Sequence, residues 1–530
     1  MLKGYFKSPF SQCLAICILS FIVRILIAAF TGLGIGESYY ARGAVDLQLS
    51  YFDQPPLFFW LSYLTTQMLG FNQLAIRLPA IVLFFGTSLL LYFTTKQIYN
   101  EWAGFYAVLI MNIAFVFTIP IGTWFQPDAP LIFFWMLCVW AVTKLFFRKI
   151  PYNKNDIHAF LWWILIGISI GLASLSKYHS IFLIFGIFMF VITNRQNRHW
   201  LKHPGPYIAI LIVLLLLLPV FIWNSRNNWV SFNFQGSRAG FHNGFRLHFD
   251  WLARSIIGQS IWLIPWIWFW LMQQLYRTTR QAFHSTKQSF FFWMSVTPIV
   301  FFTIITLWAN TLFHFHWQAP GYMILFIPLG NRFYEKSKLR PKRVYRKLLV
   351  SSIILILLAT IATIHMVTGF WQYYGPGQIA KACGGSYDPT IEGIDFEEIR
   401  DRFEKEGWLT NENIFPASVR WWQVGKIDWA LSCKKEIIIF DNDPRNYAYF
   451  SDPRLLIGKD AIVIRFPQKN LKPMIKNYFD SITKLDNIDI IRGNVVELSL
   501  EVFYCKNFHQ PDSINLANVL DRQLQGYAPY

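Results

Sequence analysis

The sequence predicts a polytopic α-helical membrane protein with about eleven transmembrane helices, followed by a small α/β domain. Hydrophobic residues make up 54% of the 530 residues and charged residues only 15%, whereas charged residues make up about 25% of ordinary soluble chains. Residues 1–370 hold 29 basic and 8 acidic residues, while residues 371–530 hold 19 and 22. We therefore expect a transmembrane domain over 1–370 and an extracytoplasmic domain over 371–530. No nucleic-acid partner is expected, because the basic residues lie in short loops between apolar segments.

The transmembrane helices are predicted from apolar segments of about 20 residues, the length that crosses a bilayer. These segments begin near Ser11, Ile76, Ala103, Asp128, Leu161, Tyr178, Tyr207, Ile256, Phe290, Gln318 and Leu348. The first segment is longer than the apolar region of a signal peptide and lacks a clear cleavage site. We expect it to be retained as a span.

Residues 56–70 form a shorter apolar segment that decides the topology. About 14 residues follow its prolines, and as a helix they would extend about 21 Å, less than the hydrocarbon core of about 30 Å. We expect an interfacial helix within a first outer loop over residues 31–75. Basic residues of the inner loops then outnumber those of the outer loops by about three to one, as the positive-inside rule requires. This topology puts the N-terminus in the cytoplasm and the C-terminal domain outside it.

The C-terminal part has the pattern of a small mixed α/β domain. Segments rich in Ile and Val predict strands, and more polar segments predict helices. The expected strands are 436–440, 461–466 and 495–504, and the expected helices are 396–406 and 471–479. If this domain lies outside the cytoplasm, Cys383, Cys433 and Cys505 allow one disulfide and one free thiol. The sequence does not determine which two would pair.

Two acids of the first outer loop are candidates for catalysis. Glu37 follows a glycine-rich turn after the first span, and Asp53 lies 16 residues later in the turn YFDQPP. One interpretation is a general base with a second, positioning carboxylate. The alternative is structural, with Glu37 capping a helix over residues 38–49 and Asp53 forming a turn.

Further charged residues of the outer loops are candidates for the same site. Asp128, in the motif QPDAP, either points into the site or caps the helix that it begins. Lys177, Arg226 and Arg238 either hold a phosphate at the membrane surface or extend to lipid headgroups. His316 forms an i, i+2 pair with a second histidine, but two histidines without a third ligand are a weak metal signature. Aromatic packing is the alternative for this pair.

Six short motifs appear in order along the chain. They are ESYY (37–40), YFDQPPL (51–57), PDAPL (127–131), LSKY (175–178), WN with WVSF (223–224 and 229–232), and HWQAP (316–320). Together they resemble the bacterial branch of the dolichyl-phosphate-mannose–protein mannosyltransferase family, which has a GT-C fold and is related to the lipid A aminoarabinose transferases. The resemblance covers nearly the whole chain.

The resemblance implies a multi-pass glycosyltransferase of the bacterial inner membrane, with its C-terminal domain in the periplasm. Such enzymes move a sugar, with inversion, from a polyprenyl-phosphate carrier to a lipid, glycan or protein acceptor. We expect neither metal nor cofactor, because cationic side chains neutralise the phosphate. The implied catalytic residues are Glu37, Asp53 and Asp128, and the implied substrate-binding residues are Tyr39, Tyr40, Lys177, Arg226, Arg238 and His316.

One departure from the family pattern concerns the catalytic base. The family usually has Asp-Glu at the start of the first loop, and this chain has Gly36-Glu37. Either Glu37 or Asp128 takes the role of the missing aspartate, or activity is lost and the chain is an assembly subunit. A transporter or flippase of lipid-linked sugars is a further alternative. It is disfavoured because the acids gather at one surface, with only Arg24 inside a predicted span, whereas transporters place ionisable residues near the midplane.

Overall fold

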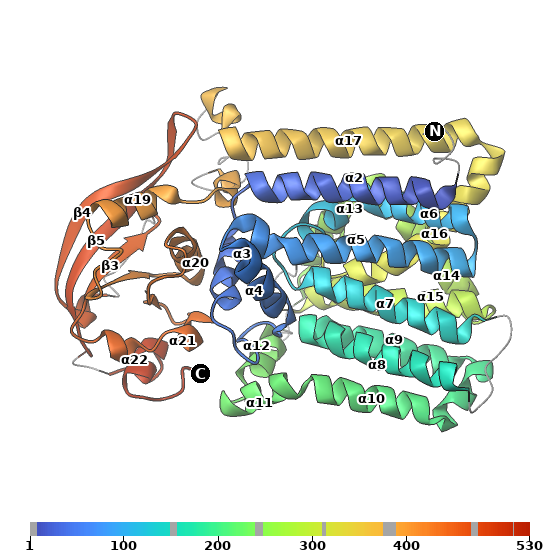
Figure 1. The fold of residues 1–530 in the computed structure, drawn as a ribbon, viewed down its shortest axis with the longest axis horizontal. Helices are drawn as coiled ribbons and strands as arrows, with labels where there is room; N and C mark the ends of the chain where they lie inside the picture. Colours follow the sequence, from blue (N-terminus) through green and yellow to red (C-terminus); the bar gives the residue numbers. More distant parts are fainter. Residues whose placement is uncertain are drawn as a thin grey trace.

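A computed structural model describes residues 8–148, 156–238, 247–309, 314–374, 388–467, 475–511 and 514–530. Long, roughly aligned helices form a bundle, and a sheet domain built from the C-terminal part lies at one end of it (Figure 1). The predicted fold class, a helical membrane bundle with a small α/β domain, is confirmed.

The number of spans differs from the prediction. Among the described residues, six helices are long and apolar enough to cross a membrane, and nine spans result if each of three bent helix pairs counts as one. The six are α2 (Pro9–Phe30), α5 (Gln73–Ile98), α7 (Asp128–Phe146), α8 (Ile157–Ser176), α15 (Thr286–Ile304, extended to Leu307 by the short helix η5) and α17 (Pro341–Thr368). The bent pairs are η3 and α9 (Tyr178–Thr193) with η4 (Arg195–Lys202), α10 (Pro204–Leu216) with α11 (Leu218–Arg226), and α13 (Phe249–Leu263) with α14 (Pro265–Gln281).

Two predicted spans account for the difference from eleven. Helix α6 (Glu101–Asn112) has only 12 residues. Helix α16 (Ala319–Leu339) carries charged residues through its last third. Both nevertheless lie in the bundle core, where Gly330 of α16 packs so closely on α6 that a Cβ there would lie 2.4 Å from the carbonyl oxygen of Ala103. Small residues at such contacts let helix backbones approach in a membrane.

The first outer loop forms short helices between the bundle and the sheet domain (Figure 1). Helix α4 (Leu57–Leu69) has 13 residues, too few to cross a bilayer. Helix α3 (Ile35–Ala41) is shorter than expected and is followed by one 3-10 turn, η1 (Arg42–Ala44). Its N-cap is Gly34, and Glu37 is its third residue, so the predicted cap position was wrong.

The C-terminal domain contains a five-stranded sheet in the order β2-β1-β3-β5-β4. Strands β1, β2 and β3 are parallel, and β5 runs antiparallel to β3 and β4. The strands are β1 (Ile414–Ser418), β2 (Ile438–Ile439), β3 (Asp460–Arg465), β4 (Phe479–Arg492) and β5 (Val495–Phe508). Helices α19 (Glu397–Lys405), α20 (Trp421–Ala430), α21 (Tyr447–Phe450) and α22 (Val519–Leu524) pack with it.

Most predicted elements of this domain are present, with one exception. Residues 471–474 of the expected helix lie outside the described residues, and its remainder includes a 3-10 turn, η9 (Lys476–Tyr478), that leads into β4. Cys433 and Cys505 are buried free thiols. Cys383 lies outside the described residues.

Helix α20 fastens the C-terminal domain to the first outer loop. A Cβ on Gly425 would lie 2.7 Å from the backbone nitrogen of Tyr39, so glycine is required for this close contact. The Arg42 guanidinium pairs with both carboxylate oxygens of Asp428 at 2.9 and 2.7 Å. The buried Lys426 donates to the carbonyl oxygens of Leu33, Glu392 and Ile394. The loop that carries Glu37 and Tyr40 is thereby fixed to the sheet domain.

The two ends of the bundle differ in character. The start of α2 and the hairpin between α16 and α17 lie at the end far from the sheet domain, and α17 returns along the length of the bundle to that domain (Figure 1). Lys336, Lys338, Arg343 and Lys347 lie at this far end, in the last turns of α16 and the first turns of α17. The first outer loop lies at the opposite end, beside the sheet domain.

Candidate active site

Two buried carboxylates, Asp53 and Asp128, mark the end of the bundle that faces the sheet domain. Their exposed fractions are 4% and 2%. A buried carboxylate is costly unless hydrogen bonds or cations compensate its charge. The partners of each acid therefore determine what chemistry it can perform.

Asp128 is paired with a lysine from the neighbouring helix. It is the first residue of α7, and Lys177 follows the last residue of α8. The lysine Nζ lies 3.0 and 2.8 Å from the two carboxylate oxygens of Asp128. His316 Nε2 lies 3.7 Å from Oδ2 of the same acid. Asp128 therefore holds Lys177 in one position. It also lies at the start of α7, where the sequence indicated the start of a helix.

Asp53 is buried without such a partner. Its Oδ1 accepts a hydrogen bond from Asn446 Nδ2 at 3.3 Å, and its Oδ2 lies 3.5 Å from the Tyr40 hydroxyl. No ion pair to Asp53 is present among the described residues. Burial raises the pKa of Asp53 above its usual range, although the charges of Arg445 and Arg238 partly oppose this shift. A weakly held carboxylate of raised pKa is suited to accept a proton.

Cationic side chains connect the surroundings of the two acids. The Arg238 guanidinium lies 4.9 Å from the ring centre of Trp317, and Lys177 Nζ lies 5.4 Å from the same ring. Arg238 and Arg445 also share the ring of Phe234, at 5.5 and 5.7 Å. Burial lowers the pKa of Arg238. The structure thus brings together Asp53, Asp128, Lys177, Arg238 and His316, which we call the acid–cation cluster.

Glu37 is also buried, but both of its carboxylate oxygens already have hydrogen-bond partners. Its carboxylate pairs with Arg77 through Nε at 2.7 Å and Nη2 at 2.6 Å. The same oxygens accept the backbone N–H groups of Phe125 at 2.8 Å and Gly34 at 3.0 Å. Glu37 therefore fixes the segment that leads to Asp128 and leaves no carboxylate oxygen without a partner.

The remaining predicted residues, Tyr40, Tyr39 and Arg226, lie in three different places. Tyr40 is half-buried, and its hydroxyl faces Asp53. Tyr39 is buried between α3 and the sheet domain, 4.9 Å from Trp421. Its ring is therefore covered by protein. Arg226 is exposed at the end of α11, and no ion pair to it is present among the described residues.

Three residues of the site were missed from the sequence. Asn446 reaches Asp53 from the C-terminal domain, and Gln235 donates to the Asp53 carbonyl oxygen at 2.7 Å. Arg445, which pairs with Asp443 at 3.1 Å, acts on Asp53 through its charge. Arg445 has φ +51°, a left-handed conformation that is costly for a residue with a side chain. The turn-rich segment DNDPRNYAYF around it was the available signal. Among the described residues, no group of three His, Cys, Asp or Glu side chains is arranged to hold a metal ion.

A family model matches this part of the chain. Residues 53–223 match the model described as dolichyl-phosphate-mannose-protein mannosyltransferase. The match begins at Asp53 and includes Asp128 and Lys177. It stops before Arg238 and the C-terminal domain.

Curated relatives match over parts of their length. Undecaprenyl phosphate-alpha-4-amino-4-deoxy-L-arabinose arabinosyl transferase 2 of Proteus mirabilis is 26% identical over 180 residues, which cover 33% of this chain and 30% of that protein. Lipid A galacturonosyltransferase RgtD of Rhizobium johnstonii is 22% identical over 299 residues, which cover 54% of this chain and 58% of that protein. This chain therefore spans less than two thirds of either relative.

A solved structure matches over nearly the whole chain. ArnT from Cupriavidus metallidurans, bound to undecaprenyl phosphate, superposes with a TM-score of 0.62 at 14% identity, covering 92% of this chain and 97% of that one. The chain therefore has the fold of ArnT, and its predicted resemblance to the dolichyl-phosphate-mannose–protein mannosyltransferase family is confirmed over residues 53–223.

Proposed function

We propose that this chain is an integral-membrane glycosyltransferase that moves a sugar from a polyprenyl-phosphate carrier to a lipid, glycan or protein acceptor. The observation that carries the proposal is the acid–cation cluster. In it Asp53 is buried near Arg238 without an ion-pair partner among the described residues, and Arg238 shares the Trp317 ring with Lys177. Such a transfer needs a base for the acceptor and positive charge for the departing phosphate. The cluster offers both.

The relatives support the chemistry of the donor. One is named for an undecaprenyl phosphate sugar and another for lipid A. The structure of ArnT holds undecaprenyl phosphate. We extend these properties to this chain because residues 53–223 match the family and the folds agree.

In the proposed step, Asp53 accepts the proton of the acceptor group as that group attacks the anomeric carbon of the sugar. A bond forms between the acceptor and the anomeric carbon. The bond between this carbon and the phosphate oxygen breaks, and its electron pair leaves with the lipid phosphate. Attack opposite the leaving group inverts the anomeric configuration. Because burial raises the pKa of Asp53, it is a stronger base than an exposed aspartate once it is ionised.

The cations stabilise the negative charge that develops on the lipid phosphate. Arg238 and Lys177 carry this role, and Asp128, which His316 also approaches, holds Lys177 in place. Charges positioned before the reaction stabilise a transition state without reorganisation. Tyr40 lies beside Asp53 and supplies an aromatic face for the sugar.

The structure shows what surrounds Gly36, which stands where the family usually has an aspartate. A Cβ added to Gly36 would meet no atom of the described residues within 4 Å, so the described part of the chain leaves the position of that aspartate open. Glu37 holds Arg77 instead of acting as a base. We therefore assign the base to Asp53.

The proposed reaction takes place on the periplasmic side of a bacterial inner membrane. The excess of basic residues at the opposite end of the bundle supports this side, because basic residues favour the cytoplasmic face. A cavity of about 630 Å³, lined by Phe52, Phe234 and Asp443 among others, opens next to the Asp53 turn. It offers a route for substrate to the cluster.

A transfer assay tests the proposal. The full chain is reconstituted in proteoliposomes with labelled undecaprenyl-phosphate aminopentose or uronic acid donors and lipid A as acceptor. We expect the wild type to transfer label and Asp53→Asn to lose about 10²–10⁴-fold in rate, the usual contribution of a general base.

Asp250→Asn is the matched control. Asp250 is 60% exposed at the start of α13 and pairs only loosely with Arg254, at 3.9 Å. This variant should keep the wild-type rate. Full activity of Asp53→Asn would refute the assignment of the base, and transport of the donor without transfer would favour a flippase.

A further inference from the structure

The hairpin between α16 and α17 concentrates positive charge at the end of the bundle far from the candidate active site. We define the basic hairpin by its seven cationic residues, Arg332, Lys336, Arg340, Lys342, Arg343, Arg346 and Lys347. None of the seven forms an ion pair with a carboxylate among the described residues. The acid of this hairpin, Glu335, pairs with Lys338 at 3.2 Å. The charge of the basic hairpin is therefore not neutralised by the described part of the chain.

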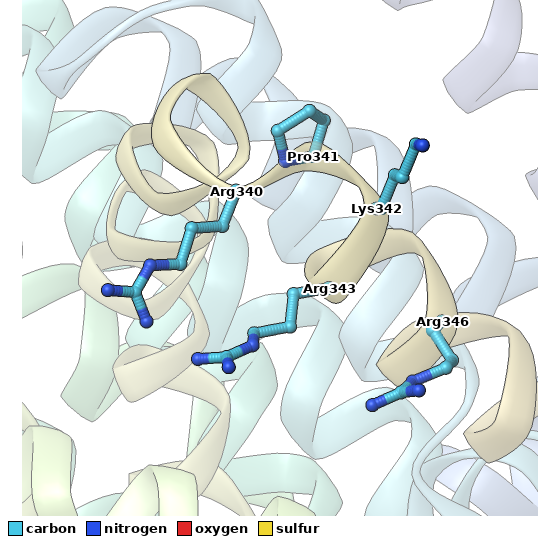
Figure 2. Close-up of a pocket in the computed structure, with 5 residues that line it drawn as sticks. All are labelled: Arg340, Pro341, Lys342, Arg343 and Arg346. Atoms are coloured by element: carbon cyan, nitrogen blue, oxygen red, sulfur yellow. The ribbon is translucent and has the colours of Figure 1, made fainter.

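Three of these arginines line one cavity. Arg340, Arg343 and Arg346 surround a space of about 640 Å³ together with Pro341 and Lys342. Figure 2 shows the three guanidinium groups on the same side of the hairpin, whereas Lys342 points away. Guanidinium groups gathered in this way match the oxygens of a phosphate.

The basic cavity continues into an apolar groove. A second cavity of about 330 Å³ shares Arg340 and Arg343 with the first and is also lined by Trp270, Phe333 and Val344. A third cavity of about 440 Å³ shares Trp270 with the second and extends along α17. It is lined by Trp266, Trp270, Arg346, Lys347, Val350, Ser351 and Ile354. The three spaces thus form one surface, cationic at the hairpin and aromatic or aliphatic along the helix.

A buried arginine nitrogen lies at the boundary between the two parts. Arg332 Nε is buried without a hydrogen-bond partner among the described residues, while its Nη2 donates to Gln273 Oε1 at 2.9 Å. A buried donor without a partner is costly, and so are neighbouring like charges. An anion in this position would relieve both costs.

We propose that the basic hairpin binds an anionic phospholipid of the bilayer. Its phosphate lies among Arg340, Arg343 and Arg346, and an acyl chain lies along the groove formed by Trp266, Trp270 and Ile354. The apolar groove selects a lipid over free phosphate, and basic pockets between transmembrane helices are suited to anionic headgroups. This site is distinct from the proposed donor site, which lies at the other end of the bundle.

Native mass spectrometry of the full chain, purified in detergent with added phosphatidylglycerol, tests this proposal. The triple variant Arg340→Gln, Arg343→Gln and Arg346→Gln should bind the lipid roughly a hundredfold more weakly, since each cation near an anionic headgroup contributes about a fivefold step. The three side chains are exposed, so the variant should fold.

The matched control removes the same charge from another exposed segment, with Arg195→Gln, Arg198→Gln and Lys202→Gln in η4. It should bind the lipid as the wild type does. Equal losses in both triple variants, or unchanged binding in the first, would overturn the proposal. So would displacement of the lipid by millimolar inorganic phosphate, or equal binding of phosphatidylcholine.

Discussion

At the scale of single residues, the least expected observation concerns Glu37. The sequence favoured this residue as the base, but its carboxylate is bound by Arg77, which is 1% exposed. Spacing along the chain did not reveal this pair, because the two residues are 40 positions apart and meet only in the folded chain, where Arg77 at the start of α5 reaches Glu37 of α3. By contrast, Asp53 lies in a turn and Asp128 at the start of a helix, as the sequence motifs predicted.

The Glu37–Arg77 pair leads to a prediction for stability. Glu37→Gln leaves the Arg77 charge buried without its counter-ion, which typically costs about 3–5 kcal/mol. Thermal unfolding of the purified protein should therefore occur at a much lower temperature. The double variant with Arg77→Met should recover part of the loss and retain measurable transfer. If folded Glu37→Gln protein were as inactive as Asp53→Asn, Glu37 would be the base instead.

The raised pKa of Asp53 leads to a prediction for the pH dependence of activity. The base acts in its ionised form, so kcat/KM should fall as the pH drops through the pKa of Asp53. Because burial raises this pKa and Arg445 and Arg238 only partly oppose it, the fall should begin at higher pH than for an exposed aspartate. Arg445→Gln removes one opposing charge and should move the acid limb to still higher pH. A profile that is flat down to the ordinary range of aspartate would contradict the role of Asp53.

At the scale of secondary-structure elements, the contact between α20 and α3 joins the two parts of the molecule. Gly425→Ala would place a methyl group 2.7 Å from the backbone of Tyr39, which cannot move as a side chain can. Overpacking of this kind costs about 1–3 kcal/mol. Hydrogen exchange should show loss of protection in α3 and α20. Gly36→Ala is the control, because it meets no atom within 4 Å, and it should leave protection unchanged.

The same scale shows what the sequence could and could not predict. The strands β3 and β5 were predicted because β-branched residues follow one another there. Strand β1 was missed because it contains Pro416, which usually argues against a central strand. Strand β4 was missed because polar and charged residues dominate this exposed edge of the sheet. The segment DNDPRNYAYF indicated a turn-rich loop, but nothing in the sequence placed its Asn446 at the site, because Asn446 meets Asp53 across more than 390 residues of sequence.

At the scale of the whole molecule, the distribution of charge predicts how the chain is oriented. Leu339, at the basic hairpin, and Leu455, on the C-terminal domain, are 82% and 72% exposed. With Cys383 replaced by serine, a cysteine at position 455 should react with a membrane-impermeant maleimide on intact spheroplasts. A cysteine at position 339 should react only after permeabilisation. The reverse pattern would contradict the proposed periplasmic site.

The central claim is that Asp53 performs the chemistry while Lys177 and Arg238 hold the phosphate of the donor. The measurement that tests it most directly compares turnover with the affinity for undecaprenyl phosphate in the same reconstituted variants. Asp53→Asn should lose turnover and bind the lipid phosphate as tightly as the wild type, whereas Lys177→Met with Arg238→Met should bind it far more weakly. Loss of lipid binding in Asp53→Asn with unchanged turnover per bound donor, or full binding in the double variant, would contradict the claim.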